Sequence, residues 1–331
     1  MLLCNARPAR GPEDRRENDM LQPKALAVIS EVRKAILGKD TVVCKVLMAI
    51  LARGHILLED NPGVGKTTLA LAFSKAMSLQ YNRVQFTPEV MPADVVGFSV
   101  WDRDTGGFTY RPGAALCNLF LADEINRTSA KTQSALLEAM EEGQVTVDSV
   151  SHPLPRPFTV IATQNPLGTA GTQPLPESQL DRFMLRLSIG YPSLEQEVLI
   201  LKQTEGGRPV DSIRRVATLE EVLQMQEEVA QVHVAEELYR FVAQLCAATR
   251  EHPLIRMGAS PRAGGALVRA CRASAWMAGR DYIIPEDIRL LYYNALEHRI
   301  VPDPQARLSG RTPHALLAEV WESVPSPKAV G

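Results

Sequence analysis

Short apolar runs alternate with helical patterns along the chain from Leu21 to Pro192. Runs of buried type predict strands at 55–59, 82–86, 119–122, 159–163 and 183–189. Apolar residues at helical spacing predict helices at 21–37, 40–53, 66–78, 130–142 and 176–180. Because strands and helices alternate, we expect an α/β fold with a parallel sheet that is covered by helices on both faces.

A second pattern begins at Ser193, after which we see only helical spacing. It predicts helices at 194–203, 219–232, 235–250, 261–278 and 285–296. A last helix is predicted from Thr312, a candidate N-cap followed by Pro313, to about Val324. We therefore expect an ATPase-like α/β core over 21–192 and a smaller all-α lid domain over 193–325.

The first twenty residues, 1–20, are rich in Arg, Glu, Asp and Asn and have little apolar content beyond the first four positions. Such a composition predicts a disordered tail. Met20 immediately precedes the first helical pattern, which makes it a candidate translation start.

A phosphate-binding loop is predicted between the first strand and the helix at 66–78. Gly63 and Gly65 allow the backbone N–H groups to approach phosphates closely, and the helix N-terminus adds partial positive charge. Lys66 can reach the β- and γ-phosphates, and the Thr67 hydroxyl can bind Mg²⁺. The predicted nucleotide-binding residues are Asn61, Pro62, Gly63, Val64, Gly65, Lys66, Thr67 and Thr68.

One position departs from the strict phosphate-loop pattern, which has Gly where this chain has Asp60. Pro62-Gly63 supplies a preset turn in its place. We expect Lys66 to be the loop's only cation facing the phosphates, at an exposed strand-to-helix edge. A chance lysine in a glycine-rich turn is the alternative, and the acidic motif downstream disfavours it.

Two adjacent acids, Asp123 and Glu124, follow the apolar run 119–122. Parallel strands of α/β sheets bind ligands at their carboxyl ends. We expect Asp123 to hold Mg²⁺ through its water shell and Glu124 to take a proton from, or orient, an attacking water. Asn165, at the tip of the strand at 159–163, could hold that water or sense the γ-phosphate, although Asn-Pro is also an ordinary turn initiator.

These motifs, in this order, resemble the AAA+ ATPases and, within them, the MoxR family, over roughly residues 21–300. The most specific stretch runs from Leu121 through Asp123-Glu124-Ile125-Asn126-Arg127 to Glu142. Phe86-Thr87-Pro88-Glu89, Ala162-Thr163-Gln164-Asn165-Pro166, Leu180-Asp181-Arg182-Phe183 and Ser260-Pro261-Arg262 also match. The resemblance implies a five-stranded sheet of order 5-1-4-3-2, which the spacing alone does not give.

The resemblance also implies roles for single residues. Asn165 resembles the sensor-1 amide, Arg182 the arginine finger that reaches the neighbouring subunit's ATP, and Arg262 the sensor-2 arginine of the lid. Gly38 resembles the turn beside the adenine. Fixed guanidinium groups stabilise the charge that builds on a transferred phosphoryl group. The alternatives are a surface ion pair between Asp181 and Arg182, and a solvated helix-start arginine at 262.

Two segments are longer than plain connections, and long loops are usually functional. Residues 87–112 resemble the family's helix-2 insert. Residues 143–157 resemble its pre-sensor-1 hairpin, and the sequence predicts two short strands there, at 143–148 and 154–158, around a polar turn. In related rings such loops face the pore or the partner. Phe98 and Trp101 are candidate contacts, with local packing as an equally supported reading.

Composition narrows the function classes. Hydrophobic and charged contents of 45% and 22% are typical of a globular protein. The net charge of −2 gives no positively charged surface of the kind that binds nucleic acid. The five cysteines show no metal-binding spacing, so Cys44, Cys117, Cys246 and Cys271 are predicted core residues of a cytoplasmic protein. The longest apolar candidate, 42–58, is interrupted by charged residues, so no membrane insertion is expected.

We interpret the chain as an ATP- and Mg²⁺-dependent ATPase that forms a hexameric ring and remodels or activates a client protein. The resemblance implies clients that often contain a von Willebrand A domain, sometimes in metal-cofactor insertion. One alternative is a nucleic-acid motor of the same superfamily, which would need a basic pore and a DNA module. The other is an ATP-gated binding protein with little hydrolysis, which Glu124, Asn165 and Arg182 disfavour.

Overall fold

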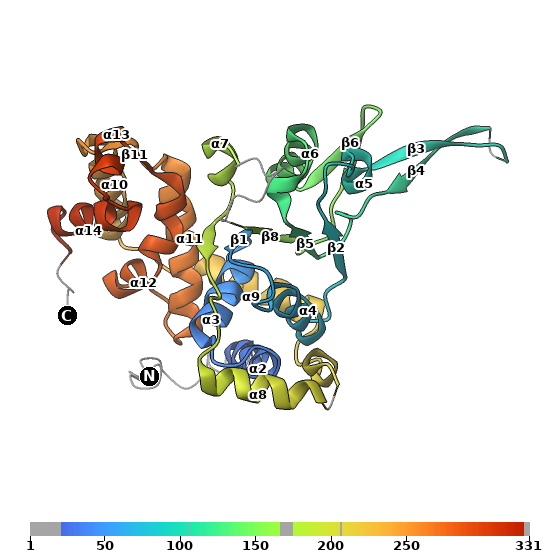
Figure 1. Ribbon diagram of the computed structural model, residues 1–331, viewed down its shortest axis with the longest axis horizontal. Helices are drawn as coiled ribbons and strands as arrows, with labels where there is room; N and C mark the ends of the chain where they lie inside the picture. The colour runs from blue at the N-terminus through green and yellow to red at the C-terminus, as the bar shows by residue number, and fades with distance from the viewer. Residues whose placement is uncertain (1–20, 105, 166–174, 206, 328–331) are drawn as a thin grey trace.

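A five-stranded parallel sheet lies at the centre of the α/β part of the molecule (Figure 1). Its strands are β1 (Ile56–Glu59), β2 (Tyr81–Gln85), β5 (Leu119–Asp123), β8 (Thr159–Gln164) and β9 (Leu185–Leu187). Their order across the sheet is β2-β5-β8-β1-β9, and all neighbours are parallel. Counted along the chain this is 5-1-4-3-2, which confirms the order implied by the resemblance.

The computed structural model describes residues 21–104, 106–165, 175–205 and 207–327. The predicted disordered tail, with Cys4 and Met20, lies outside these residues.

Helices cover both faces of the sheet, as Figure 1 shows. On one face, Ile56 and Leu58 pack in an apolar cluster with α2 (Leu21–Arg33), α3 (Asp40–Leu51) and α4 (Lys66–Ala76). On the other face, Leu57 packs with α5 (Pro92–Val96) and α6 (Ala130–Glu142). This alternation is the period-two pattern of a strand that is buried on both sides.

Most predicted boundaries differ from the observed ones by only a few residues. Among the helices, the largest difference is at α2, which ends at Arg33 rather than at residue 37. The N–H groups of Lys34 and Ala35 bond to carbonyls three residues back, so the regular helix gives way to turns directly after Arg33. Gly38, with a φ of +67°, closes this turn segment before α3.

The region after Pro192 is largely helical. Its helices are α8 (Leu194–Glu205), α9 (Leu219–Gln231), α10 (Glu236–Glu251), α11 (Pro261–Met277), α12 (Pro285–Leu296), α13 (Pro304–Leu308) and α14 (Pro313–Ser323). The sequence analysis did not predict the short helix α13, nor the antiparallel pair of β10 (Ile255–Met257) and β11 (Val301–Pro302). Strands of two or three residues are too short to show a period-two pattern. Their pairing also depends on residues that are far apart in the sequence.

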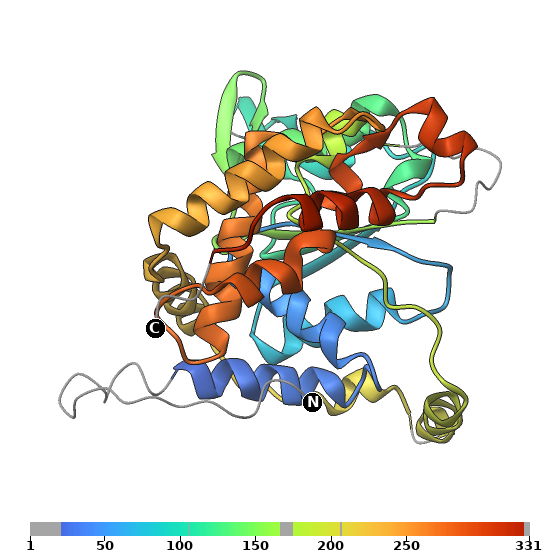
Figure 2. The same cartoon turned by 90° about the vertical axis from the view of Figure 1, so that its left-hand side faces the viewer.

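The helical region packs directly on the α/β region. The apolar cluster around α2, α3 and α4 continues into α9–α14, seen side by side in Figure 2. Polar contacts add to this packing, because buried Arg299 donates from Nε to Asp181 Oδ1 at 2.7 Å. Ser260 Oγ donates to Asp181 Oδ2 at 2.9 Å. The segment that carries Arg182 is therefore joined to the start of α11.

Both long connections form antiparallel hairpins. The first contains α5 and the pair β3 (Gly97–Asp102) and β4 (Gly107–Pro112), which projects from the body in Figure 1. The second is the pair β6 (Gln144–Val147) and β7 (Val150–Pro153). Two short strands around a polar turn are confirmed, but the expected position of the second strand at 154–158 is wrong, because the chain turns at 148–149 and the strand that pairs with β6 ends at Pro153.

Three smaller observations complete the fold. Cys44, Cys117, Cys246 and Cys271 are buried and free, as predicted for core residues. Thr312 Oγ1 accepts from Ala315 N at 3.2 Å, so it is the N-cap of α14 as predicted. Within the described part of the chain, no helix is both long enough and apolar enough to cross a membrane.

Candidate active site

The predicted phosphate loop lies between β1 and α4, at the carboxyl end of the sheet's second strand from one edge. Gly63 and Gly65 have φ values of +86° and +95°, which L side chains rarely adopt. An added Cβ at Gly63 would meet no atom of the described residues within 4 Å, so backbone conformation rather than crowding requires glycine there. The loop therefore presents a left-handed turn to open space at the N-terminus of a helix.

Lys66 is buried, with 9% of its surface exposed, and this corrects the expectation of an exposed edge. Its Nζ donates to the Asp60 carbonyl oxygen at 2.6 Å, so the side chain folds back along the loop. Burial lowers the pKa of the Lys66 ammonium, while the carboxylates of Asp60, Asp123 and Glu124 raise it. The loop lysine and the paired acids therefore lie within electrostatic reach of one another, although they are distant in the sequence.

Asp60, the departure from the strict loop pattern, has a structural explanation. Its buried carboxylate accepts from Ser188 Oγ at 2.7 Å, from Ile189 N at 2.7 Å and from Gly190 N at 3.0 Å. A glycine could make none of these bonds. Asp60 therefore connects the phosphate loop to the segment that leads from β9 to the lid.

The paired acids lie at the carboxyl end of β5, as predicted. Asp123 is 8% exposed, and its Oδ1 accepts from Thr163 Oγ1 at 2.6 Å while its Oδ2 accepts from Arg83 Nη2 at 2.8 Å. The Glu124 backbone is left-handed, with φ +57°, and its N–H donates to the same Thr163 hydroxyl at 2.8 Å. Glu124 Oε2 forms an ion pair with Arg127 at 2.9 Å.

The strand tip after β8 lies beside these acids. β8 pairs with both β5 and β1, so Asn165, which directly follows β8, is brought near both motifs. Asn126 Nδ2 donates to the Asn165 carbonyl oxygen at 3.5 Å, and Gln164 Nε2 donates to Glu59 Oε1 at 2.8 Å. The structure thus places the predicted amide at the same sheet edge as Asp123.

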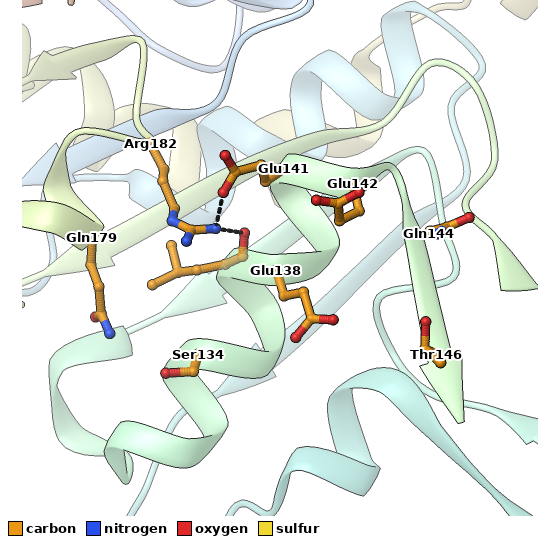
Figure 3. Close-up of a pocket in the computed structure, with 9 residues that line it drawn as sticks. Ser134, Glu138, Glu141, Glu142, Gln144, Thr146, Gln179 and Arg182 are labelled. Carbon is orange, nitrogen blue, oxygen red and sulfur yellow. Dashed lines mark hydrogen bonds and ion pairs between the residues drawn. The ribbon is translucent and has the colours of Figure 1, made fainter. Parts of the chain in front are cut away.

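The two arginines meet on one carboxylate, that of Glu141 at the end of α6. Figure 3 shows the Arg182 side of this arrangement. Arg182 Nη1 lies 2.6 Å from Glu141 Oε2, and Arg262 Nη2 bonds to Glu141 Oε1. Asp181 bonds to Arg299 and Ser260, so the alternative of an Asp181–Arg182 surface pair is wrong.

Two cavities flank these groups. One, of about 480 Å³, lies beside Arg182 and is lined by Ser134, Leu137, Glu138, Glu141, Glu142, Gln144, Thr146, Gln179 and Arg182. The other, of about 250 Å³, adjoins the phosphate loop and is lined by Glu59, Asp60, Asn61, Val64, Ser188, Gly190 and Tyr191. Gly38, predicted beside the adenine, is not among the lining residues, and a Cβ there would overlap the Gln196 side chain.

The donor groups fit a magnesium nucleotide. Phosphate groups could bind in the space beside Gly63, where the Lys66 ammonium and the N-terminus of α4 both supply positive charge. The described ranges contain no group of three or more His, Cys, Asp or Glu arranged to hold a metal ion. A metal at this site would therefore rely on Thr67, Asp123, phosphate oxygens and water, which is how Mg²⁺ is usually held.

Sequence reasoning missed two residues of this site. Thr163 is fully buried and bridges the paired acids. A polar residue at the end of an otherwise apolar strand was the available signal. Glu141 was only part of the matched signature, and its partners could not be found from sequence, because they lie 41 and 121 positions away.

Two family models match the chain. That of the ATPase family associated with various cellular activities (AAA) matches residues 55–185, and that of the AAA lid domain matches residues 247–320. The first span contains the phosphate loop, the paired acids and Arg182, and the second contains Arg262.

Known proteins match almost the whole chain. Uncharacterized protein YeaC of Bacillus subtilis is 43% identical over 93% of this chain and 96% of its own length. Chaperone MoxR1 of Mycobacterium tuberculosis is 36% identical over 91% of this chain and 81% of its own. A crystal structure from Cytophaga hutchinsonii, of a protein described as an ATPase, has a TM-score of 0.87 at 35% identity and covers 94% of this chain and 97% of its own.

Proposed function

The chain belongs to the MoxR family of AAA+ ATPases, and we propose that it uses ATP hydrolysis to remodel or activate a client protein. The observation that carries this proposal is that the phosphate loop, which follows β1, and the paired acids, which end β5, lie at the same carboxyl edge of the sheet, because β8 pairs in parallel with both strands. Nucleotide binding and hydrolysis follow from the family. The client, the ring and the roles of single residues are parts of the proposal.

We assign the hydrolytic roles as follows. The backbone N–H groups of 63–68 and the Lys66 ammonium would hold the phosphates. Thr67 and Asp123 would hold Mg²⁺, which when bound would neutralise charge on the phosphate oxygens. Glu124 takes a proton from the attacking water, and Asn165 orients that water. Arg127 pairs with Glu124, so Glu124 must leave that ion pair before it acts as a base.

Arg182 and Arg262 stabilise the charge of the transferred phosphoryl group in this proposal. The shared carboxylate of Glu141 supports a common target for the two arginines. Lys66, in contrast, bonds to Asp60 within its own phosphate loop, so in this proposal it acts on the ATP of its own subunit. We propose that Arg182, as the arginine finger, reaches the ATP of a neighbouring subunit in a head-to-tail ring, with six subunits as the expected number. Arg262, the lid arginine that shares Glu141 with it, would act on the γ-phosphate.

The projecting hairpin β3–β4 is the proposed client contact. Phe98, Trp101 and Phe108 are 50%, 54% and 74% exposed, and Trp101 and Phe108 pack edge-to-face with ring centres 5.2 Å apart. The aromatic pair agrees with both roles considered for Trp101, local packing and client contact. Trp101 packs against Phe108, and about half of its surface still faces solvent, where a client could bind. A client with a von Willebrand A domain, and a part in metal-cofactor insertion, remain proposals from the family.

We propose a division into an ATPase core over 21–192 and a lid over 193–325, in a protein that works in the cytoplasm. Asp60 provides a link across the proposed boundary. Its hydrogen bonds connect the phosphate loop of the core to residues 188–190, which lie just before the lid.

The two alternatives, a nucleic-acid motor and an ATP-gated binding protein, are separated from the proposal by a steady-state ATPase assay with and without DNA. The proposal predicts turnover that DNA does not stimulate. Strong stimulation by DNA would favour the motor, and tight ATP binding without turnover would favour the gated binding protein.

A further inference from the structure

We propose that Glu141 is a positioning residue that holds Arg182 and Arg262 as a pair for phosphoryl transfer. This inference rests on the proposed function, in which both arginines act on the γ-phosphate. Glu141 can have this role because it forms ion pairs with both arginines, whereas the paired acids and the phosphate loop bind other partners.

The first argument is the geometry of the two ion pairs, of which Figure 3 shows the one between Glu141 and Arg182. Glu141 uses a different oxygen for each guanidinium, Oε2 for Arg182 and Oε1 for Arg262. Arg182 Nη1 also donates to the Leu137 carbonyl oxygen at 2.6 Å, one turn earlier in α6. The last turn of α6 therefore holds one edge of the Arg182 guanidinium, where the partial negative charge of a helix C-terminus favours a cation.

The second argument is that the two arginines come from different parts of the chain. Arg182 lies between α7 (Glu177–Leu180) and β9, whereas Arg262 is in the first turn of α11. Only a group between them can set the distance between the two guanidinium groups. Glu141 is the residue that contacts both in the described part of the chain.

The third argument is that other bonds fix the two backbone segments. Asp181 accepts from Arg299 and from Ser260, and Arg299 Nη2 also donates to the Asp181 carbonyl oxygen at 2.9 Å. These bonds do not involve Glu141. Removal of its charge should therefore leave the lid docked, while Arg262 loses its ion pair and Arg182 keeps only its bond to the Leu137 carbonyl oxygen.

Partial exposure of the pair supports a role in catalysis rather than in stability. The side chains of Glu141, Arg182 and Arg262 are 35%, 28% and 46% exposed. Ion pairs in such positions add little to folding stability. A misplaced catalytic group, in contrast, is costly to turnover.

The test is Glu141→Gln in the full chain. We expect kcat for ATP to fall about 10- to 100-fold, the size of effect that misplacement by an ångström produces, with little change in ATP affinity or in melting temperature. Glu141→Asp should recover part of the rate. Glu138→Gln, on the same helix and the same cavity but paired with neither arginine, is the matched control and should keep the wild-type rate.

A double-mutant comparison separates positioning from a general structural effect. If Glu141 acts through Arg182, then Glu141→Gln should lower kcat much less in an Arg182→Ala background than in the wild type. A wild-type kcat for Glu141→Gln, or an undiminished loss in that background, would overturn this inference alone. A wild-type kcat for Arg182→Ala and for Arg262→Ala would overturn the proposed roles of the arginines and the inference with them.

Discussion

The carboxylate of Asp60 accepts a hydrogen bond from the backbone N–H of Ile189 at 2.7 Å. Asp60 belongs to the phosphate loop and Ile189 to the segment that leads to the lid, so this bond joins the nucleotide site to the part of the chain that must move if the lid responds to ATP. The position that departs from the strict loop pattern is therefore a connection between the two regions.

Asp60→Ala should destabilise the protein and weaken ATP binding. The change leaves Ser188 Oγ and two backbone N–H groups without their buried acceptor. We expect a loss of about 2 to 4 kcal/mol in the free energy of unfolding, since each unsatisfied buried donor costs about 1 to 3 kcal/mol. Urea denaturation and nucleotide titration measure the two effects. Asp148→Asn, at an exposed turn, is the control, because Asn tolerates the left-handed backbone of that position (φ +50°) and only the charge is lost. Equal stability of the two variants would contradict the account.

Thr163→Val should lower kcat about 10- to 100-fold, because the hydroxyl fixes the Asp123 carboxylate and the Glu124 backbone together. Thr163→Ser keeps the hydroxyl and should recover most of the rate. Thr159→Val is a matched control on the same strand, since the buried Thr159 hydroxyl has no hydrogen-bond partner among the described residues. Similar rates for Thr163→Val and Thr159→Val would remove Thr163 from this role.

Arg182→Ala should keep ATP binding and lose about 10³-fold in hydrolysis if it acts as arginine fingers do elsewhere. Lys66→Ala should remain folded and lose tight ATP binding. A mixture of the two variants should recover activity, because the Lys66→Ala subunit lends its arginine to the intact loop of its neighbour. The readout is ATPase rate against mixing ratio. No recovery at any ratio, or full activity in a monomer, would contradict action between subunits.

Stability should fall as the pH is lowered from about 6.5. Burial lowers the pKa of His55 to about 4 and the pKa of His298 well below its ordinary value. Between these values and about 6.5, the unfolded chain binds protons that the folded protein does not bind, so acid favours unfolding. Each histidine contributes at most about 1.4 kcal/mol per pH unit.

The measurement is the urea midpoint at pH 7, 6 and 5 for the wild type and for His55→Gln. The variant should show the smaller decrease, because the neutral ring of His55 bonds to Met140 and Val160 only in the folded state. His314→Gln, at a more exposed site, should keep the wild-type slope. A flat profile in the wild type would show that these groups do not control acid stability.

The sequence predicted the fold well where the signal was local. The phosphate loop could be predicted because a strand, a glycine turn and a helix follow one another around Lys66. The paired acids could be predicted because Asp123 directly follows a short run of buried, apolar residues. Thr312 as an N-cap was also readable. The order of the strands came from the resemblance, because spacing along the chain does not specify which strands are neighbours.

The parts that could not be predicted depend on contacts between distant residues. The bonds from Asp60 to the segment at 188–190, the two pairs of Glu141, and the bridge made by Thr163 each join separate elements. The burial of Lys66 has the same origin, since the loop folds over a side chain that the sequence places at a helix start. Residues of this kind become visible only when the sheet brings the strand ends together.

The measurement that tests the central claim most directly is capture of a partner by Glu124→Gln with ATP. The amide keeps the size of the side chain and loses the base, while Asp123 is unchanged, so the variant should bind ATP and turn it over far more slowly. Lys66→Ala combined with Glu124→Gln is the control that should not hold ATP. The account predicts a protein in cell extract that is retained by Glu124→Gln with ATP and by neither the wild type nor the control. Retention of no protein above the wild-type background would contradict the remodelling function, and retention of DNA or RNA instead would favour the motor.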